Sequence, residues 1–150
     1  MLREKLVADM KDAMRAGEKA RLGTIRLMNS AIKSADIEAR PSGKDAISDA
    51  EIMQVFAKMI KQRRDSVEQF TNGGRLELAA SEQAEIAVIE SYMPKQMSDA
   101  EVKAVASSLI TELGAVGMKD MGKVIAAMKE KFAGAMDFGK ASGIVKDLLK

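Results

Sequence analysis

The sequence contains no histidine and no cysteine. Histidine is the commonest general base near neutral pH, and cysteine supplies thiolate nucleophiles and soft metal ligands. Their absence excludes zinc hydrolases, Ser-His-Asp hydrolases and Cys-His proteases, and it also excludes disulfide bonds. We predict no catalytic residue, no metal site and no cofactor for this chain.

Aromatic residues are scarce as well, at 3% of the chain. The four phenylalanines fall at positions where helix packing needs them: Phe56, Phe70, Phe132 and Phe138. RNA-binding modules that stack bases need exposed aromatic side chains. If the partner is RNA, we therefore expect recognition through shape and backbone charge, with a steep dependence on salt.

Long apolar segments are absent too, because no run approaches the ~18 residues that a membrane span requires. The N-terminal residues mix acidic and basic side chains on an amphipathic pattern. This pattern lacks the continuous apolar segment of a secretory signal peptide. Without an export signal and without cysteine, we expect a cytoplasmic protein with no membrane partner.

Helical periodicity runs through the first 94 residues. Apolar residues at three- and four-residue spacing predict helices at 2–16, 19–39, 49–71 and 76–93. Ser48 with Glu51 forms a capping box at the start of the third helix, and the Asn72-Gly73-Gly74 turn ends it. The side chains expected to face the core in the first and fourth helices are Leu2, Leu6, Met10, Met14, Leu76, Ala79, Ile86, Ile89 and Met93.

Pro94 ends the fourth predicted helix, because proline lacks a backbone donor and cannot continue it. We place a hinge at 95–97, between an N-terminal helical domain at 1–94 and a C-terminal module at 98–150. Ser98 with Glu101 forms a second capping box, which opens the first of three shorter helices at 99–113, 120–133 and 139–150. No alternating strand pattern is present, so we predict an all-α fold with four helices followed by three.

The net charge is only +2, but the charge is unevenly distributed. Residues 75–112 hold three basic and seven acidic side chains, whereas residues 118–150 hold seven basic and four acidic ones. A second basic cluster consists of Lys58, Lys61, Arg63 and Arg64. This distribution is compatible with a polyanion bound at one end, with two complementary surfaces that face each other, or with ordinary solvated helix faces.

Two short motifs resemble catalytic ones but lack their required context. Ser30 and Lys33 match S-x-x-K without the other elements of the penicillin-recognising enzymes. The segment 117–124 approaches a phosphate-binding loop, but Val124 replaces the hydroxyl residue and no strand precedes Gly117. This segment either binds an anion through backbone N–H groups, Lys119 and Lys123, or is a glycine turn with exposed lysines.

Acidic side chains also gather on two neighbouring predicted helices. These residues are Asp65, Glu68, Glu82, Glu85 and Glu90. Paired carboxylates can bind a hard cation or perform acid–base chemistry. Their spacing does not require either role, and acids on a surface helix are usually solvated.

Several segments occur in a characteristic order: IKQRRDSVEQF, the glycine turn, EIAVIESYMP, SDAE, MKDMGKVIAAMKEKF and DFGKASGIVKDLL. Together they resemble the YqeY family of small bacterial proteins, over nearly the whole chain. The last two segments are also similar to the tail of the B subunit of the aspartyl/glutamyl-tRNA amidotransferase. The resemblance implies an N-terminal helical part followed by a three-helix GatB/YqeY-type module.

In that B subunit, the tail helps to hold tRNA while a different domain performs transamidation. The resemblance therefore implies tRNA or the amidotransferase as partner, with backbone contacts from Lys119, Lys123, Lys129, Lys131 and Lys140. The catalytic domain of the B subunit has no counterpart in this chain. A label such as carbon–nitrogen ligase with glutamine as amido-N-donor would be inherited through the shared tail, and we do not expect the chain to catalyse that reaction alone.

Three functions remain open at this point. A tRNA-associated accessory protein predicts basic side chains clustered on one surface of the C-terminal module. A helical protein-interaction module without a nucleic-acid role predicts an exposed apolar groove, with Met118, Met121 and Met136 as candidates. An enzyme that uses carboxylates predicts a concave pocket that holds acids with perturbed pKa values.

Overall fold

The computed structural model describes residues 1–150, which form seven α-helices, two short 3-10 helices and no strand. The all-α prediction is confirmed. The chain divides into two compact units, which we call unit 1 (Met1–Met93) and unit 2 (Pro94–Lys150). None of the helices combines the length and the apolar character needed to cross a membrane.

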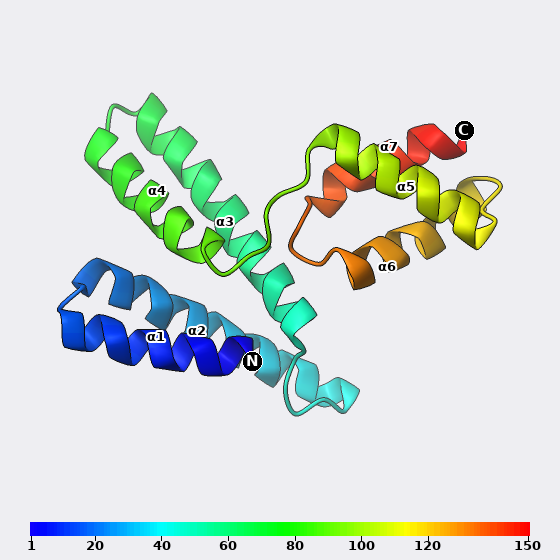
Figure 1. Ribbon diagram of the computed structural model, residues 1–150. Helices are drawn as coiled ribbons and strands as arrows, with labels where there is room; N and C mark the ends of the chain where they lie inside the picture. Colours follow the sequence, from blue (N-terminus) through cyan, green and yellow to red (C-terminus); the bar gives the residue numbers. More distant parts are fainter. The chain divides into compact units, whose positions relative to one another are not determined.

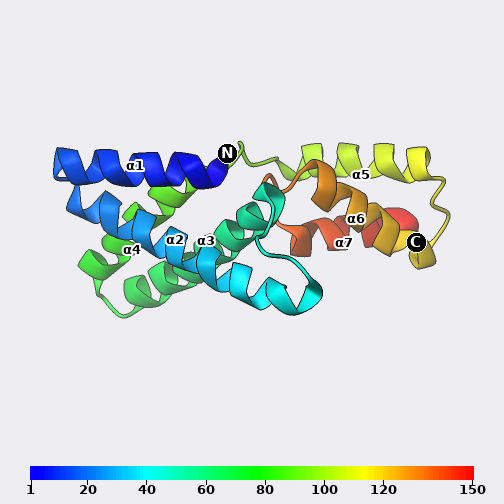
Figure 2. The same cartoon turned by 90° about the horizontal axis from the view of Figure 1, so that it is seen from below.

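Unit 1 contains four α-helices, arranged as two hairpins (Figure 1). They are α1 (Leu2–Ala16), α2 (Lys19–Ala39), α3 (Asp49–Asn72) and α4 (Leu76–Glu90). A 3-10 helix, η1 (Arg40–Ser42), continues from the end of α2. Figure 2 shows α1 beside α2, and α2 also packs on α3 and α4. The core is completed by Phe56, Ile52, Ile86 and Ile89, which are fully buried.

Local sequence signals set most helix ends. Ser48 Oγ accepts a hydrogen bond from the Glu51 backbone N–H, so the predicted capping box is present at the start of α3. Ser98 and Glu101 form the same arrangement at the start of α5. Gly17 follows α1 with a φ of 72°, a left-handed conformation that glycine adopts without steric cost.

The predicted core positions of α1 and α4 need two corrections. Met14 is 53% exposed, and Ala13 is buried in its place. Four-residue steps advance by 400°, so a row of them drifts off the buried face, whereas the step from Leu6 to Ala13 returns to it. Leu76 is 63% exposed because it begins α4, where the helix has not yet reached the core. The helix α4 also ends at Glu90, and residues 91–93 form a turn instead of the predicted last turn of helix.

Beyond the end of α4, Tyr92 folds back into unit 1. Its ring is buried, and its hydroxyl donates a hydrogen bond to Asp9 of α1. This contact joins the two ends of unit 1 in sequence. Arg3 makes a second long-range contact, because its guanidinium donates two hydrogen bonds to Asp36 of α2 and one to the carbonyl of Ile47.

Unit 2 contains α5 (Asp99–Leu113), the 3-10 helix η2 (Met118–Asp120), α6 (Met121–Lys131) and α7 (Phe138–Leu149). Each of the three α-helices packs on the other two. Val124, Met128, Val145 and Ala106 are completely buried between them. Unit 2 therefore has an apolar core of its own.

The residues of the predicted hinge attach to the turn between α6 and α7. The Gln96 side-chain amide donates to the Gly134 carbonyl over 2.6 Å, and the Met97 backbone N–H donates to the Ala135 carbonyl over 2.8 Å. Two of the three hinge residues are thus held within unit 2.

Candidate nucleic-acid interface

The five lysines proposed as backbone contacts are all exposed in unit 2. Lys119 lies in η2 and Lys140 in α7, and neither has an acidic partner within 4 Å. Lys123 lies 3.8 Å from Asp120, and Lys131 lies 3.8 Å from Glu112 of α5. Both pairs are long, and each lysine is more than half exposed, so the pairs contribute little and these lysines stay available to another anion.

The structure does not bring the five lysines onto one face. The ammonium of Lys129 lies 5.9 Å from the centre of the Phe138 ring in α7, whereas Lys131 points toward Glu112 of α5. Residues two positions apart on a helix point about 200° apart, which explains why Lys129 and Lys131 flank α6 on opposite sides. A rigid segment of RNA backbone that lies on one face of α6 would therefore contact only some of these lysines.

The segment 117–124 adopts a helical turn and not a phosphate-binding loop. Gly117 is fully extended, η2 follows it, and α6 begins at Met121. Asp120 Oδ2 accepts a hydrogen bond from the Val116 backbone N–H over 3.1 Å. The Asp120 carboxylate therefore already accepts from one of the backbone N–H groups beside this turn. An anion bound here would be attracted mainly by the ammonium groups of Lys119 and Lys123.

The second basic cluster divides into two kinds of side chain. The Arg63 guanidinium donates to Glu85 of α4 over 2.9 Å and to the Met59 carbonyl, and Arg64 donates to Glu90 over 2.9 Å. These arginines of α3 pair with glutamates of α4. Complementary charges on the facing sides of α3 and α4 therefore explain part of the uneven charge distribution along the sequence. Lys58 and Lys61 are exposed, and no acidic group lies within 4 Å of either.

The acidic residues on α3 and α4 do not form a metal site in this structure. Nowhere do three acidic side chains come together in a geometry that could hold a metal ion. Glu85 and Glu90 are instead bound by the arginines of α3.

A row of cations along α2 was missed by the sequence reasoning. They are Lys19, Arg26 and Lys33 of α2 and Arg40, which begins η1 directly after it; all four are exposed, and they follow one another at intervals of seven residues. None has an acidic partner within 4 Å. The signal was present in the sequence as a seven-residue repeat of basic residues. Lys33 belongs to this basic row, and it makes no hydrogen bond to Ser30, so the S-x-x-K match carries no catalytic pair.

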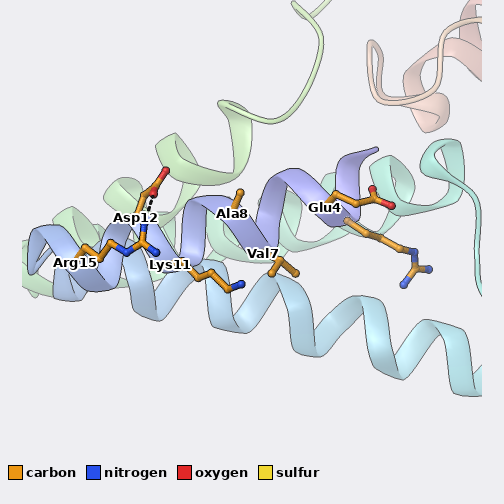
Figure 3. A pocket seen from close by; sticks show the side chains of 7 residues that line it. Glu4, Val7, Ala8, Lys11, Asp12 and Arg15 are labelled. Carbon is orange, nitrogen blue, oxygen red and sulfur yellow. Dashed lines mark ion pairs between the residues drawn. The ribbon is translucent and has the colours of Figure 1, made fainter.

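Two surface depressions contain carboxylates. The first, of about 470 Å³, lies on the outer face of α1, where Val7 and Ala8 form an apolar centre between charged side chains (Figure 3). Its Glu4 carboxylate has a lowered pKa because the N-terminal ammonium is hydrogen-bonded to it. The second depression, of about 550 Å³, includes Glu51, whose pKa is lowered by Lys44. A general acid needs a raised pKa, so neither carboxylate fits that role.

Comparison with known proteins identifies the family. The model of the family described as Yqey-like protein matches residues 3–149. The chain belongs to the YqeY family. The match includes both units, so the family resemblance of the sequence motifs is confirmed.

Three YqeY relatives come from yeasts, and each is named altered inheritance of mitochondria protein 41, mitochondrial. The protein from Lachancea thermotolerans is 38% identical over 110 residues, which are 72% of this chain and 57% of the relative. The Vanderwaltozyma polyspora protein is 31% identical over 77% of this chain and 64% of its own length. The protein from Saccharomyces cerevisiae strain YJM789 is 33% identical over 73% of this chain and 60% of its own length.

The matched region therefore spans about three-fifths of the length of these YqeY relatives. Their names place them in mitochondria, so the expectation of a plainly cytoplasmic protein is contradicted. That expectation depended on the N-terminal pattern and on the absence of cysteine, and neither distinguishes the cytoplasm from a mitochondrial compartment. The relatives also extend the similarity beyond the bacterial proteins that the motifs resembled.

Proposed function

We propose that this YqeY protein is a tRNA-associated accessory protein that binds the RNA backbone through unit 2. The observation that carries the proposal is the set of exposed lysines on η2, α6 and α7, of which Lys119 and Lys140 have no acidic partner. Lysine ammonium groups bind phosphates as point charges and read no base sequence. The similarity of this module to the amidotransferase tail supports tRNA as the class of RNA.

Binding to the RNA backbone, and not to the bases, also agrees with the partial burial of the phenylalanine side chains of unit 2. The side chains of Phe132 and Phe138 are half-buried against the core of unit 2, so neither offers an open stacking platform for a base. The proposed role is binding, and a carbon–nitrogen ligase label would describe a complex with the amidotransferase and not this chain alone. The amidotransferase is accordingly the proposed protein partner.

The test is a titration of fluorescent bulk tRNA with the full-length protein at two salt concentrations. Lys119→Glu/Lys123→Glu should weaken binding strongly, and binding by the unchanged protein should fall steeply as salt rises. The control Lys95→Glu/Lys103→Glu makes the same charge change on exposed, unpaired lysines elsewhere in unit 2. Absence of binding at low salt and tens of micromolar protein, or equal losses in both variants, would contradict the proposal.

A second measurement uses the opposite directions of two lysines on α6. If RNA lies on one face of α6, only one of the variants Lys129→Gln and Lys131→Gln should weaken tRNA binding. Equal effects would indicate contacts on both sides of the helix and a wrapped RNA path. No effect of either variant would restrict the contacts to Lys119, Lys123 and Lys140.

Protein binding is a second candidate function, favoured by an apolar patch between α5 and η2. Leu113 is 44% exposed, Val116 79% and Met118 46%. The groove expected around Met118, Met121 and Met136 is not formed as predicted, because Met136 is buried in the core. Val116→Asp should then abolish co-purification with the amidotransferase while leaving tRNA binding intact. Unchanged co-purification would contradict this function.

A further inference from the structure

The basic row on α2 has a geometry that most surface lysines and arginines lack. Successive members are seven residues apart, which is about 10.5 Å along the helix, and the row spans about 32 Å from Lys19 to Arg40. Seven residues fall short of two full helical turns by about 20°. The backbone of Arg40 keeps α-helical angles after the end of α2, so the four side chains follow one gently turning line along the exposed side of α2 and onto the start of η1.

Of the acidic residues of α2 and its N-cap, Glu18 and Asp36 are engaged by arginines outside the row, and the exposed Glu38 lies within 4 Å of no member of the row. No aspartate or glutamate occurs between Lys19 and Ala35. At the N-terminal end, Glu18 lies 3.8 Å from Arg21, and at the C-terminal end, Asp36 accepts two hydrogen bonds from Arg3. The row is therefore a line of positive charge that no carboxylate of unit 1 neutralises by direct contact.

We propose that the basic row on α2 is a second surface for the phosphodiester backbone of RNA. The spacing of the cations favours this ligand over an acidic protein helix. Leu27 and Ile37 are the large apolar side chains exposed on α2, at 46% and 57%, and Leu27 lies about 100° around the helix from Arg26. These two residues do not form the continuous apolar seam that a helix needs to dock on another helix, whereas phosphate contacts need only cations and hydrogen-bond donors.

This inference shares only its ligand class with the proposed function, and it assigns different residues in a different unit. Four backbone contacts on a single strand contribute a slope of about −2.8 to the plot of log affinity against log salt concentration. Removing two of the four should therefore make the measured slope shallower by about 1.4. This difference does not depend on how many contacts unit 2 adds.

The experiment measures binding of a fluorescein-labelled 20-nucleotide RNA, and of DNA with the same sequence, by the full-length protein from low to moderate salt. Arg26→Gln/Lys33→Gln should weaken binding to both and reduce the slope by the stated amount, because the contact is to the backbone. Arg26→Lys/Lys33→Arg, which keeps the charges, should bind as the unchanged protein does. Circular dichroism of each variant checks that the helices remain folded.

The matched control is Lys58→Gln/Lys61→Gln, which removes the same charge from exposed lysines of α3. Equal losses in the two double variants would overturn the proposal, since net charge would then explain the effect. A row-dependent interaction with polyglutamate, without one with RNA, would also overturn it and identify an acidic protein segment as the partner. Loss of binding in Lys119→Glu/Lys123→Glu but not in the α2 variant would leave the proposed function standing and reject this inference.

Discussion

Tyr92 and Asp9 are 83 residues apart in sequence, and the tyrosine hydroxyl donates to the Asp9 carboxylate over 2.5 Å. The ammonium of Lys5 lies 5.2 Å from the centre of the same ring. Burial of the ring, followed by the bond to Asp9, raises the pKa of Tyr92. The turn after α4 is thus fastened to α1 through the buried Tyr92 side chain, by its hydrogen bond to Asp9 and by the Lys5 ammonium over its ring.

Replacing Tyr92 with phenylalanine should lower the free energy of unfolding by about 1.5–3 kcal/mol, since it removes a hydrogen bond to a charged group while keeping the ring. Urea unfolding of the two proteins measures the difference. Asp9→Asn and the double variant complete a cycle that isolates the coupling between the two side chains. A coupling energy near zero would show that the contact does not stabilise unit 1.

The Arg3–Asp36 contact predicts a pH dependence. The Arg3 guanidinium, together with the Ile47 backbone N–H, lowers the pKa of Asp36 from 3.8 to about 2. A carboxyl group with a lowered pKa in the folded state stabilises the protein above its unfolded pKa, and this contribution is lost as the pH falls through about 2. The melting temperature of Asp36→Asn should be below that of the unchanged protein at pH 6, and the difference should shrink toward pH 2.

Thermal unfolding across this pH range measures the effect. Asp45→Asn serves as the control, because Asp45 is exposed and has no basic side chain within 4 Å. A difference between Asp36→Asn and the unchanged protein that stays constant from pH 6 to pH 2 would refute the assignment.

The two arginines of α3 should differ in their contribution to stability. The Arg63 side chain is 14% exposed and the Arg64 side chain 61% exposed. Arg63→Ala leaves Glu85 with no partner in a half-buried position, so we expect a loss of about 1–3 kcal/mol. Arg64→Ala removes an exposed ion pair and should cost below about 1 kcal/mol. Chemical denaturation of the two variants provides the comparison, and equal losses would contradict it.

Units 1 and 2 have separate apolar cores, so truncating a core side chain in one unit should destabilise that unit and not the other. Phe56→Ala removes a fully buried ring from unit 1 and should cost about 3–5 kcal/mol, and Met128→Ala in unit 2 should cost about 2–5 kcal/mol. Hydrogen exchange should show weakened protection in unit 1 for the first variant and in unit 2 for the second. Loss of protection in both units from either substitution would instead indicate one cooperative structure.

Signals that act over a few residues made most of the helices predictable. Ser48 and Ser98 marked two helix starts, the Asn72-Gly73-Gly74 turn marked the end of α3, and the observed bounds of α1 and α2 match the predicted ranges. Met14 was misplaced because a four-residue row drifts around the helix, and only packing decides whether position 13 or 14 faces the core.

The candidate interface was less accessible to sequence reasoning. The pairing of Arg63 with Glu85 depends on how α3 and α4 are aligned, which spacing along one helix does not specify. The same is true of Lys129 and Lys131, whose neighbours belong to α7 and α5. The basic row on α2 was readable from its seven-residue spacing, but its lack of acidic partners required the structure.

Tyr92 also has a practical consequence. The chain contains one tyrosine and no tryptophan, so intrinsic fluorescence excited at wavelengths above the phenylalanine absorption band comes from this one ring. Release of the hydroxyl from Asp9 and exposure of the ring to water should change that emission. Tyrosine fluorescence therefore reports the opening of unit 1 alone, while far-ultraviolet circular dichroism reports the helices of the whole chain. Two curves from one sample thus follow unit 1 and the whole protein without any added label.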